Sequence, residues 1–219
     1  MASWLTHLRV AEALRHRLSL RGYEFLAGNV APDSSNFAPD GFDPPTEITH
    51  FTQTDKSACD YNAFAAKYIE TASDERSRLF YIGYFCHLMT DVMWSLKICK
   101  PCEERFAEQF RQDETAFYRT VKRDWHAVDF EFLEAHPHFS PLEQLKNGKR
   151  LPSGLLEYFA DGMIERKIRF ITRYYGSHRT YDSEYIYLTP AMAENFVREA
   201  AAEIERELLE RGYAQRRND

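Results

Sequence analysis

Long apolar runs and clustered positive charge are both missing from this sequence of 219 residues. No apolar stretch reaches the roughly 18 residues that a membrane-spanning helix needs, so we expect no transmembrane segment. The net charge is −6 and the lysines and arginines form no basic block. General binding to nucleic acid or to an anionic membrane surface is therefore not expected, because both favour clustered Lys and Arg.

The beginning of the chain also lacks the uninterrupted apolar core of a signal peptide. Arg9, Glu12, Arg15 and His16 interrupt the hydrophobic residues there. We therefore expect a cytoplasmic protein.

Cysteine is scarce, with only four residues in the chain, and their spacing indicates no disulfide framework. Cys99 and Cys102 form one C-x-x-C motif. A structural zinc site would need a second pair or histidines at matching spacing, and neither is present. We interpret these cysteines as ordinary reduced thiols rather than as a metal site.

The fold class that the sequence predicts is all-α. Hydrophobic residues make up 44% of the chain, enough for a sizeable core, and they recur mostly with helical periodicity. We expect a single domain over residues 1–219, with the chemically informative motifs in 1–100 and a helical continuation in 101–219. The predicted helices are one capped by Ser3 and ended by Gly22, Glu24–Gly28, Tyr61–Glu70, Asp74–Lys100 stopped by Pro101, Glu103–Leu133 with a break near Asp113, Leu155–Tyr175, and Pro190–Arg211 capped by Thr189.

Three segments lack helical periodicity. The segment NVAPDSSNFAPDGFDPPTEITHF holds four of the nine prolines and is predicted to be loop. Loops of this length inside a compact domain are usually functional or disordered, and this one contains Asp33 and His50. HPHFSPLEQLKNGKRLPSG is predicted to be a second loop, and SHRTYDSEYIYL to be irregular or a short strand.

The stretch FCHLMTDVMWS places His87 and Asp91 in an otherwise apolar helix. Residues i and i+4 lie on the same face of a helix, so the two side chains can reach one point together. They form either a hydrogen-bonded core pair or two ligands of one metal ion.

Three further polar residues occur in apolar or constrained settings: His7 in WLTHL, Asp33 in GNVAPDSSN and His50 in ITHF. Taken alone, a histidine on an apolar helix face is more often a hydrogen-bonded core residue, and Asp33 is more often a turn residue. Taken together, three histidines and two aspartates are the nitrogen and oxygen ligands that zinc, iron and manganese accept. Burying so many ionisable groups without a cation would be unfavourable.

The order His, Asp, THF and then H-x-x-x-D on a helix resembles the zinc-dependent phospholipase C family of bacteria, to which the fungal single-strand nucleases are related in fold. The resemblance covers roughly the first hundred residues. It implies the same all-α fold, with Asp33, His50, His87 and Asp91 binding one zinc ion. It also implies that Asp91 bridges toward a second metal held by His7. Iron, nickel and manganese remain alternatives to zinc, with one or two ions bound.

The chain departs from the family pattern at the other metal ligands. The family uses an amino-terminal tryptophan, whereas Trp4 is internal here, and Lys97 stands where a further ligand histidine is expected. The later H-x-x-x-E motif is also missing. His126 with Asp129, or His178 with Asp182, are the candidates to substitute for it.

The resemblance implies a metal-dependent hydrolase acting on a phosphate ester, in which Asp33 orients the attacking water or accepts its proton. The substrate is expected to be a small phosphate ester, either a lipid or a soluble one such as a nucleotide. Lys97 and Lys100 are candidates to neutralise the phosphoryl oxygens, although a solvated helix end is the favoured interpretation of both. The alternative function is a non-catalytic helical protein whose structural metal ion supports binding of a partner or small ligand.

Overall fold

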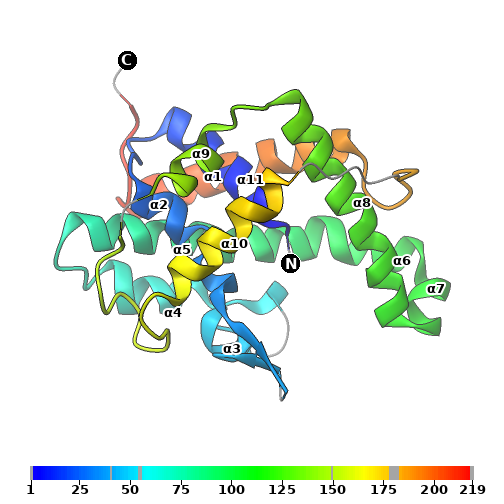
Figure 1. Cartoon of the computed structure of the whole chain (residues 1–219), viewed down its shortest axis with the longest axis horizontal. Coiled ribbons are helices and arrows are strands. Elements are labelled where there is room, and N and C mark those ends of the chain that lie inside the picture. The colour runs from blue at the N-terminus through cyan, green and yellow to red at the C-terminus, as the bar shows by residue number, and fades with distance from the viewer. Residues whose placement is uncertain (1, 40, 54–55, 149, 178–182, 218–219) are drawn as a thin grey trace.

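The computed structural model describes residues 2–39, 41–53, 56–148, 150–177 and 183–217, and they are mostly helical (Figure 1). The all-α prediction is therefore confirmed. The helices are α1 (Trp4–Arg17), α2 (Tyr23–Gly28), α3 (Thr46–Thr49), α4 (Tyr61–Phe64), α5 (Glu75–Trp94), α6 (Lys100–Arg105), α7 (Ala107–Gln112), α8 (Glu114–Ala135), α9 (Ser140–Lys146), α10 (Met163–Gly176) and α11 (Pro190–Glu210). Shorter turns are η1 (Ala31–Ser34), η2 (Lys56–Ala58), η3 (Ala65–Ile69) and η4 (Ser95–Cys99).

Several helix starts follow the sequence prediction because a polar side chain caps each of them. Ser3 accepts a hydrogen bond from the backbone of Thr6, Asp113 from that of Ala116, and Thr189 from that of Met192. Each cap satisfies one backbone N–H that has no partner inside its helix.

Other boundaries differ from the prediction. α1 ends at Arg17 rather than at Gly22, and Gly22 instead precedes α2. Pro101 does not stop the helical path, because it lies in the first turn of α6, where a missing N–H is tolerated. The second predicted loop contains α9, and α10 begins at Met163 instead of Leu155.

The proline-rich segment is less irregular than predicted. Between η1 and α3 it forms a hairpin of β1 (Asn36–Ala38) and β2 (Gly41–Asp43), which are antiparallel. The hairpin projects from the helical body beside α3 (Figure 1). Residues 183–188 of the other irregular segment carry no helix or strand, and 178–182 lie outside the described residues.

α5 lies at the centre of the fold and is packed closely against α2. A Cβ atom at Gly83 of α5 would lie 2.1 Å from the Phe25 carbonyl oxygen, and one at Gly28 of α2 would lie 2.0 Å from the Phe80 oxygen. Only glycine permits this approach of two backbones. The contact fixes the end of α2, and therefore Asn29, against the face of α5 that carries His87.

No helix in the described part of the chain is long and apolar enough to cross a membrane.

Candidate metal centre

Five polar residues from four elements meet beside α5. His87 and Asp91 come from α5, His7 from α1, Asp33 from η1, and His50 directly follows α3. We call these five residues the His/Asp cluster. His7, His87 and Asp91 are fully buried and His50 nearly so, whereas Asp33 is partly exposed. The structure thus brings together all five residues that the sequence singled out as metal ligands.

Asp91 lies in the middle of the His/Asp cluster. Its Oδ1 is 3.4 Å from His7 Nε2, and its Oδ2 is 3.6 Å from both His50 Nε2 and His87 Nε2. On the far side of His50, its Nε2 lies 3.4 Å from Asp33 Oδ1. The rings of His7 and His87 are stacked, with centroids 3.8 Å apart and planes 6° from parallel.

These separations are too long for good hydrogen bonds, which join N and O at about 2.7–3.2 Å. They agree instead with the spacing of atoms that share one ion. Ligands at about 2.0–2.1 Å from a tetrahedral zinc lie about 3.3–3.4 Å from one another. Both nitrogens of His7 and Nε2 of His87 are buried and have no hydrogen-bond partner among the described residues. The donor set therefore fits a metal ion.

Neighbouring groups orient two of the histidines. The Nδ1–H of His87 donates to the Asn29 carbonyl oxygen at 2.8 Å, which directs Nε2 toward Asp91. His50 Nδ1 is 2.9 Å from Thr49 Oγ1, and Tyr84 donates its hydroxyl proton to the Thr49 carbonyl. Such contacts fix the tautomer and ring orientation of histidines that bind metals. The sequence analysis did not identify Asn29 or Tyr84, and neither belongs to a motif that would have signalled this role.

The backbone and the electrostatics of the cluster also favour a cation. Ala2 donates its backbone N–H to Asp91 Oδ1 at 2.9 Å. Burial, followed by the neighbouring His87, lowers the pKa of His7 to about 4, although Asp91 and Asp33 act in the opposite direction. His7 is therefore neutral near pH 7, with a nitrogen lone pair available for a metal.

The candidates for a further metal site do not join the cluster. Asp129 accepts hydrogen bonds from Ser3 Oγ and from the Tyr175 hydroxyl, and His126 Nδ1 is 3.0 Å from the Tyr174 hydroxyl. Of the described residues, those whose ligand atoms all lie within 4.8 Å of one another form the groups His7–Asp33–His87 and His50–His87–Asp91. His178 and Asp182 lie outside the described residues.

The lysines proposed to contact a phosphate have other partners. Lys97 is 2.8 Å from Glu199 and Lys100 is 3.2 Å from Ser57, both in exposed positions. The favoured interpretation, a solvated helix end, agrees with these contacts. Cys99 and Cys102 are buried free thiols.

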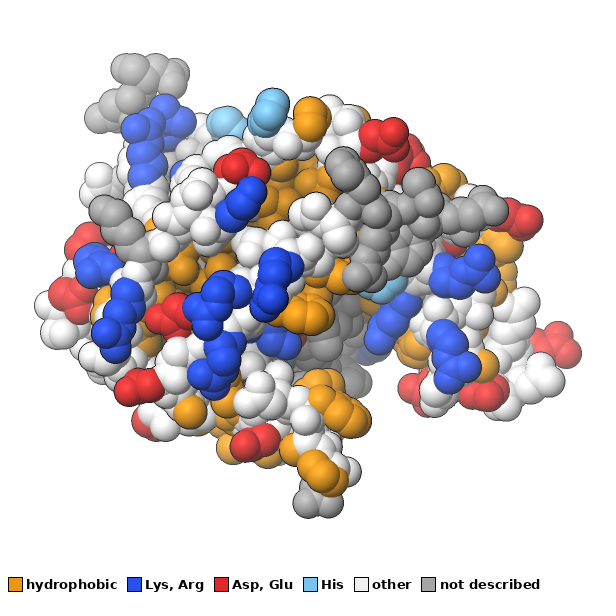
Figure 2. Space-filling view, in the orientation of Figure 1, with side chains coloured by type: hydrophobic (Ala, Val, Ile, Leu, Met, Phe, Trp, Pro, Cys, Tyr) orange, Lys and Arg blue, Asp and Glu red, His pale blue; other side chains and the backbone are white. Residues whose placement is uncertain are grey.

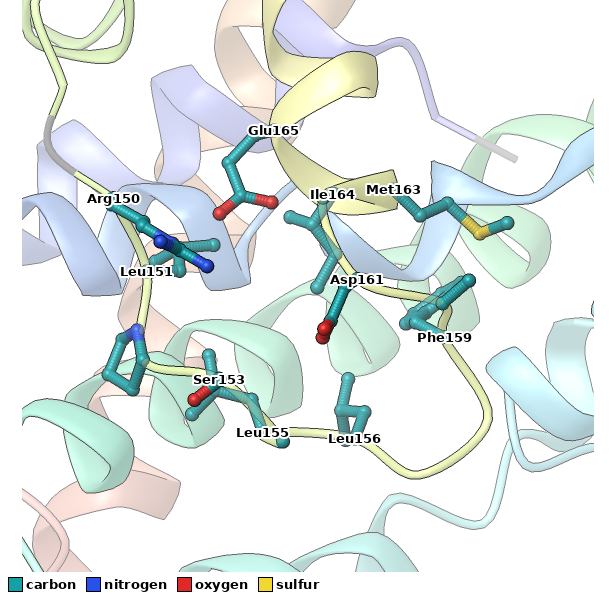
Figure 3. Close-up of a pocket in the computed structure, with 14 residues that line it drawn as sticks. Arg150, Leu151, Ser153, Leu155, Leu156, Phe159, Asp161, Met163, Ile164 and Glu165 are labelled. Carbon is teal, nitrogen blue, oxygen red and sulfur yellow. The ribbon is translucent and has the colours of Figure 1, made fainter.

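A small cavity of about 90 Å³ lies elsewhere in the molecule. The segment from Arg150 to Gly162 and the first turn of α10 line it, and the carboxylates of Asp161 and Glu165 lie at its edge (Figure 3). No member of the His/Asp cluster contributes to its lining. This cavity and the cluster are therefore separate features.

An all-helical fold with a buried group of histidines and aspartates able to hold metal ions defines the class of this protein. Residues 5–94 match the family described as zinc dependent phospholipase C. The resemblance seen in the motifs is thereby confirmed over that segment, which contains the whole His/Asp cluster. That family is one of phosphoric ester hydrolases. No curated protein and no solved structure matched the chain.

Proposed function

We propose that this protein is a metal-dependent hydrolase of a phosphate ester. The observation that carries the proposal is the convergence of three histidines and two aspartates, in which three buried histidine nitrogens lack any hydrogen-bond partner among the described residues. Protein side chains seldom remain in such a state, because an unsatisfied buried polar atom is unfavourable by about 1–3 kcal/mol. A bound cation removes that penalty for several atoms at once.

Asp33, His50, His87 and Asp91 would hold one zinc ion, and Asp91 would bridge toward a second ion with His7 as its ligand. Zinc supplies a Lewis acid that lowers the pKa of water toward neutrality and offsets negative charge on a phosphoryl group. Asp91 and His87 lie deepest and would serve to hold the metal. Asp33 is the most exposed member and is the carboxylate placed to orient the attacking water and accept its proton.

A second candidate function is a helical protein with a purely structural metal ion that binds a partner or small ligand. The complete burial of His7, His87 and Asp91 favours it, since a catalytic site must admit its substrate. The presence of Lys97 where the family pattern has a histidine favours it too.

Elemental analysis of the purified protein, combined with turnover of bis(p-nitrophenyl) phosphate across several metals, tests the two candidates. The hydrolase should carry zinc or a related ion and release nitrophenolate in a metal-dependent way. Asp33→Asn should then reduce turnover far more than it reduces the melting temperature. One tightly held ion with no turnover of any phosphate ester would support the structural alternative.

We further propose that the described helices form one domain, since their buried residues make one hydrophobic cluster extending from Ala2 to Tyr213. The cytoplasmic location stays a prediction from the sequence.

A further inference from the structure

Lys167 is a half-buried lysine of α10 that lies close to the His/Asp cluster. Its ammonium nitrogen is 5.6 Å from the centre of the Trp4 ring. Trp4 precedes His7 by one turn of α1, so the two side chains share a face of that helix. α10 also packs against η1, which carries Asp33. Lys167 therefore approaches the cluster from the side of its least buried member.

The orientation of α10 is fixed by contacts on the same face. Lys167, Phe170 and Tyr174 are spaced i, i+3 and i+7, and each of them contacts the Trp4 ring. The Phe170 and Tyr174 rings lie 5.8 and 6.1 Å from it. One residue further along, the Tyr175 hydroxyl accepts a hydrogen bond from the backbone N–H of Leu5. The position of Lys167 therefore does not depend on its own side chain.

Lys167 has an unusual electrostatic environment. Within the part of the chain that the structure describes, no carboxylate lies within 4 Å of its ammonium group, whereas Lys67 pairs with Glu157 and Lys97 with Glu199. Burial lowers the pKa of Lys167, while the charge of Asp33 acts to raise it. An ammonium group partly removed from water without a close counter-ion is unfavourable, and a bound anion would relieve this.

The surface around α10 also favours an anion. The helix carries Arg166, Arg169 and Arg173 in addition to Lys167. Figure 2 shows that basic side chains gather on the face of the molecule where this helix lies. Positive charge gathered on one face raises the local concentration of anions and steers them toward it.

The charges of the cluster create a need for such a cation. Two carboxylates and three neutral histidines carry two negative charges, which one divalent metal ion only neutralises. A phosphate ester brings further negative charge to a site with little water to screen it. A nearby ammonium group would supply the missing positive charge.

We infer that Lys167 binds the phosphate group of the substrate at the Asp33 side of the His/Asp cluster. This inference rests on the proposed function and deepens it by naming the residue that recognises the anionic group. Lys167 lies outside the segment that matches the family, and no motif in the sequence marks it.

Binding of inorganic phosphate to the zinc-loaded protein, measured by isothermal titration calorimetry, tests the inference. Lys167→Met retains most of the apolar side chain and removes the charge, and it should weaken phosphate binding roughly tenfold or more. Lys167→Arg should retain most of the affinity. Lys67→Met is the matched control, because Lys67 also lies over an aromatic ring, 5.0 Å from the centre of Tyr68, but is paired with Glu157. Zinc content should be unchanged in all three variants.

Lys167→Gln provides a second loss of charge if the methionine variant shows reduced helicity by circular dichroism. Equal phosphate affinity in the wild type and in a folded, zinc-loaded charge-loss variant would overturn the inference. So would a zinc-loaded wild type that binds no phosphate. If the wild type binds phosphate through Lys167 but hydrolyses no ester, the anion site stands and the proposed hydrolase function fails. If hydrolysis occurs, Lys167→Met should raise KM for the phosphodiester.

Discussion

Two buried polar regions of this protein differ in how their oxygen and nitrogen atoms are satisfied. In α8, Asp124 accepts hydrogen bonds from Ser183 Oγ and from the backbone N–H groups of Tyr187 and Leu188. Donors from the protein itself thus satisfy this carboxylate. In the His/Asp cluster, by contrast, lone pairs face one another, and two of the histidines have ring nitrogens with no hydrogen-bond partner among the described residues.

This difference separates a structural polar group from a ligand set. A buried carboxylate surrounded by donors holds segments of the chain together and needs nothing further. A group of acceptors surrounded by other acceptors needs a cation to be stable. Burial is similar in both regions, so the chemistry of the neighbours carries the distinction. The following predictions test it, from the largest expected effect to the smallest.

His87→Ala should have the largest effect, because it removes a ligand from the centre of the cluster. The variant should lose bound metal, and a chelator should lower the melting temperature of the wild type toward that of the variant. Excess zinc should rescue the stripped wild type but not the variant. A ligand present at about 100 times its Kd stabilises a fold by roughly 3 kcal/mol. Metal content and thermal unfolding measure both effects.

His136→Ala is the control for that experiment, since His136 is exposed and its Nδ1 contacts the Phe132 carbonyl oxygen. It should retain the metal and the melting temperature of the wild type. A wild type that carries no metal and ignores chelators would instead make the cluster a purely structural polar group, like the surroundings of Asp124.

Gly83→Ala should have the next largest effect. The added methyl group would meet the Phe25 carbonyl oxygen, so α2 must move away from α5. We expect a loss of roughly 1–3 kcal/mol in the free energy of unfolding. Because the displaced α2 carries Asn29 away from His87, the affinity for zinc should fall as well.

Gly176→Ala is the matched control for Gly83→Ala, since a Cβ added at Gly176 would meet no atom of the described residues within 4 Å. Urea unfolding and a competitive zinc titration compare the two variants. Unchanged zinc affinity in a destabilised Gly83→Ala protein would show that the Asn29 contact does not tune the metal site.

Asp129→Asn should change the pH dependence of stability. Burial raises the pKa of Asp129 to about 7, although hydrogen bonds from Tyr175 and Ser3 act in the opposite direction. In the unfolded chain the ordinary value is 3.8. Between these values the folded state holds the extra proton, so this group's contribution to stability is full below about pH 4 and falls as the pH rises toward 7. The variant should lack that decline.

Urea midpoints at several pH values between about 4 and 8 measure the effect on both proteins. Asp161→Asn, which replaces an exposed acid, should reproduce the wild-type profile. If Asp129→Asn keeps the wild-type profile, the carboxyl group titrates normally and its burial has no consequence in this pH range.

Replacing Cys99 and Cys102 with serine should have the smallest effect on the metal. Both thiols are buried, and neither belongs to the groups of described residues whose ligand atoms converge. Zinc content per chain should stay at the wild-type value even if the variant unfolds at a lower temperature. A fall in zinc content of the folded variant would show that these thiols take part in metal binding.

Local patterns in the sequence predicted much of the fold. Helical periodicity and the caps Ser3, Asp113 and Thr189 located helix starts, because these signals lie within a few residues of their effect. The hairpin at 36–43 and the late start of α10 were not predicted, because tertiary packing rather than local periodicity determines them.

The candidate site shows the same division. The i, i+4 spacing relates His87 to Asp91 directly, and the resemblance to a known family related them to His7, Asp33 and His50. Asn29 and Lys167 could not be found in this way. Asn29 reaches the cluster through the glycine contact between two helices, and Lys167 lies 134 residues after Asp33 in the chain. Their roles depend on three-dimensional packing that no short motif records.

The π-helical turn η4 makes the chain sensitive to small deletions at this point. In it the backbone N–H of Lys100 bonds to the carbonyl of Ser95, five residues earlier, so the turn holds one residue more than an α-helical turn. Deleting one residue would rotate everything downstream by about 100° about the axis of α5. Trp125, whose ring lies 5.3 Å from that of Trp94, would lose this contact. Natural variants of this protein should therefore conserve the length of 95–99 more strictly than its sequence.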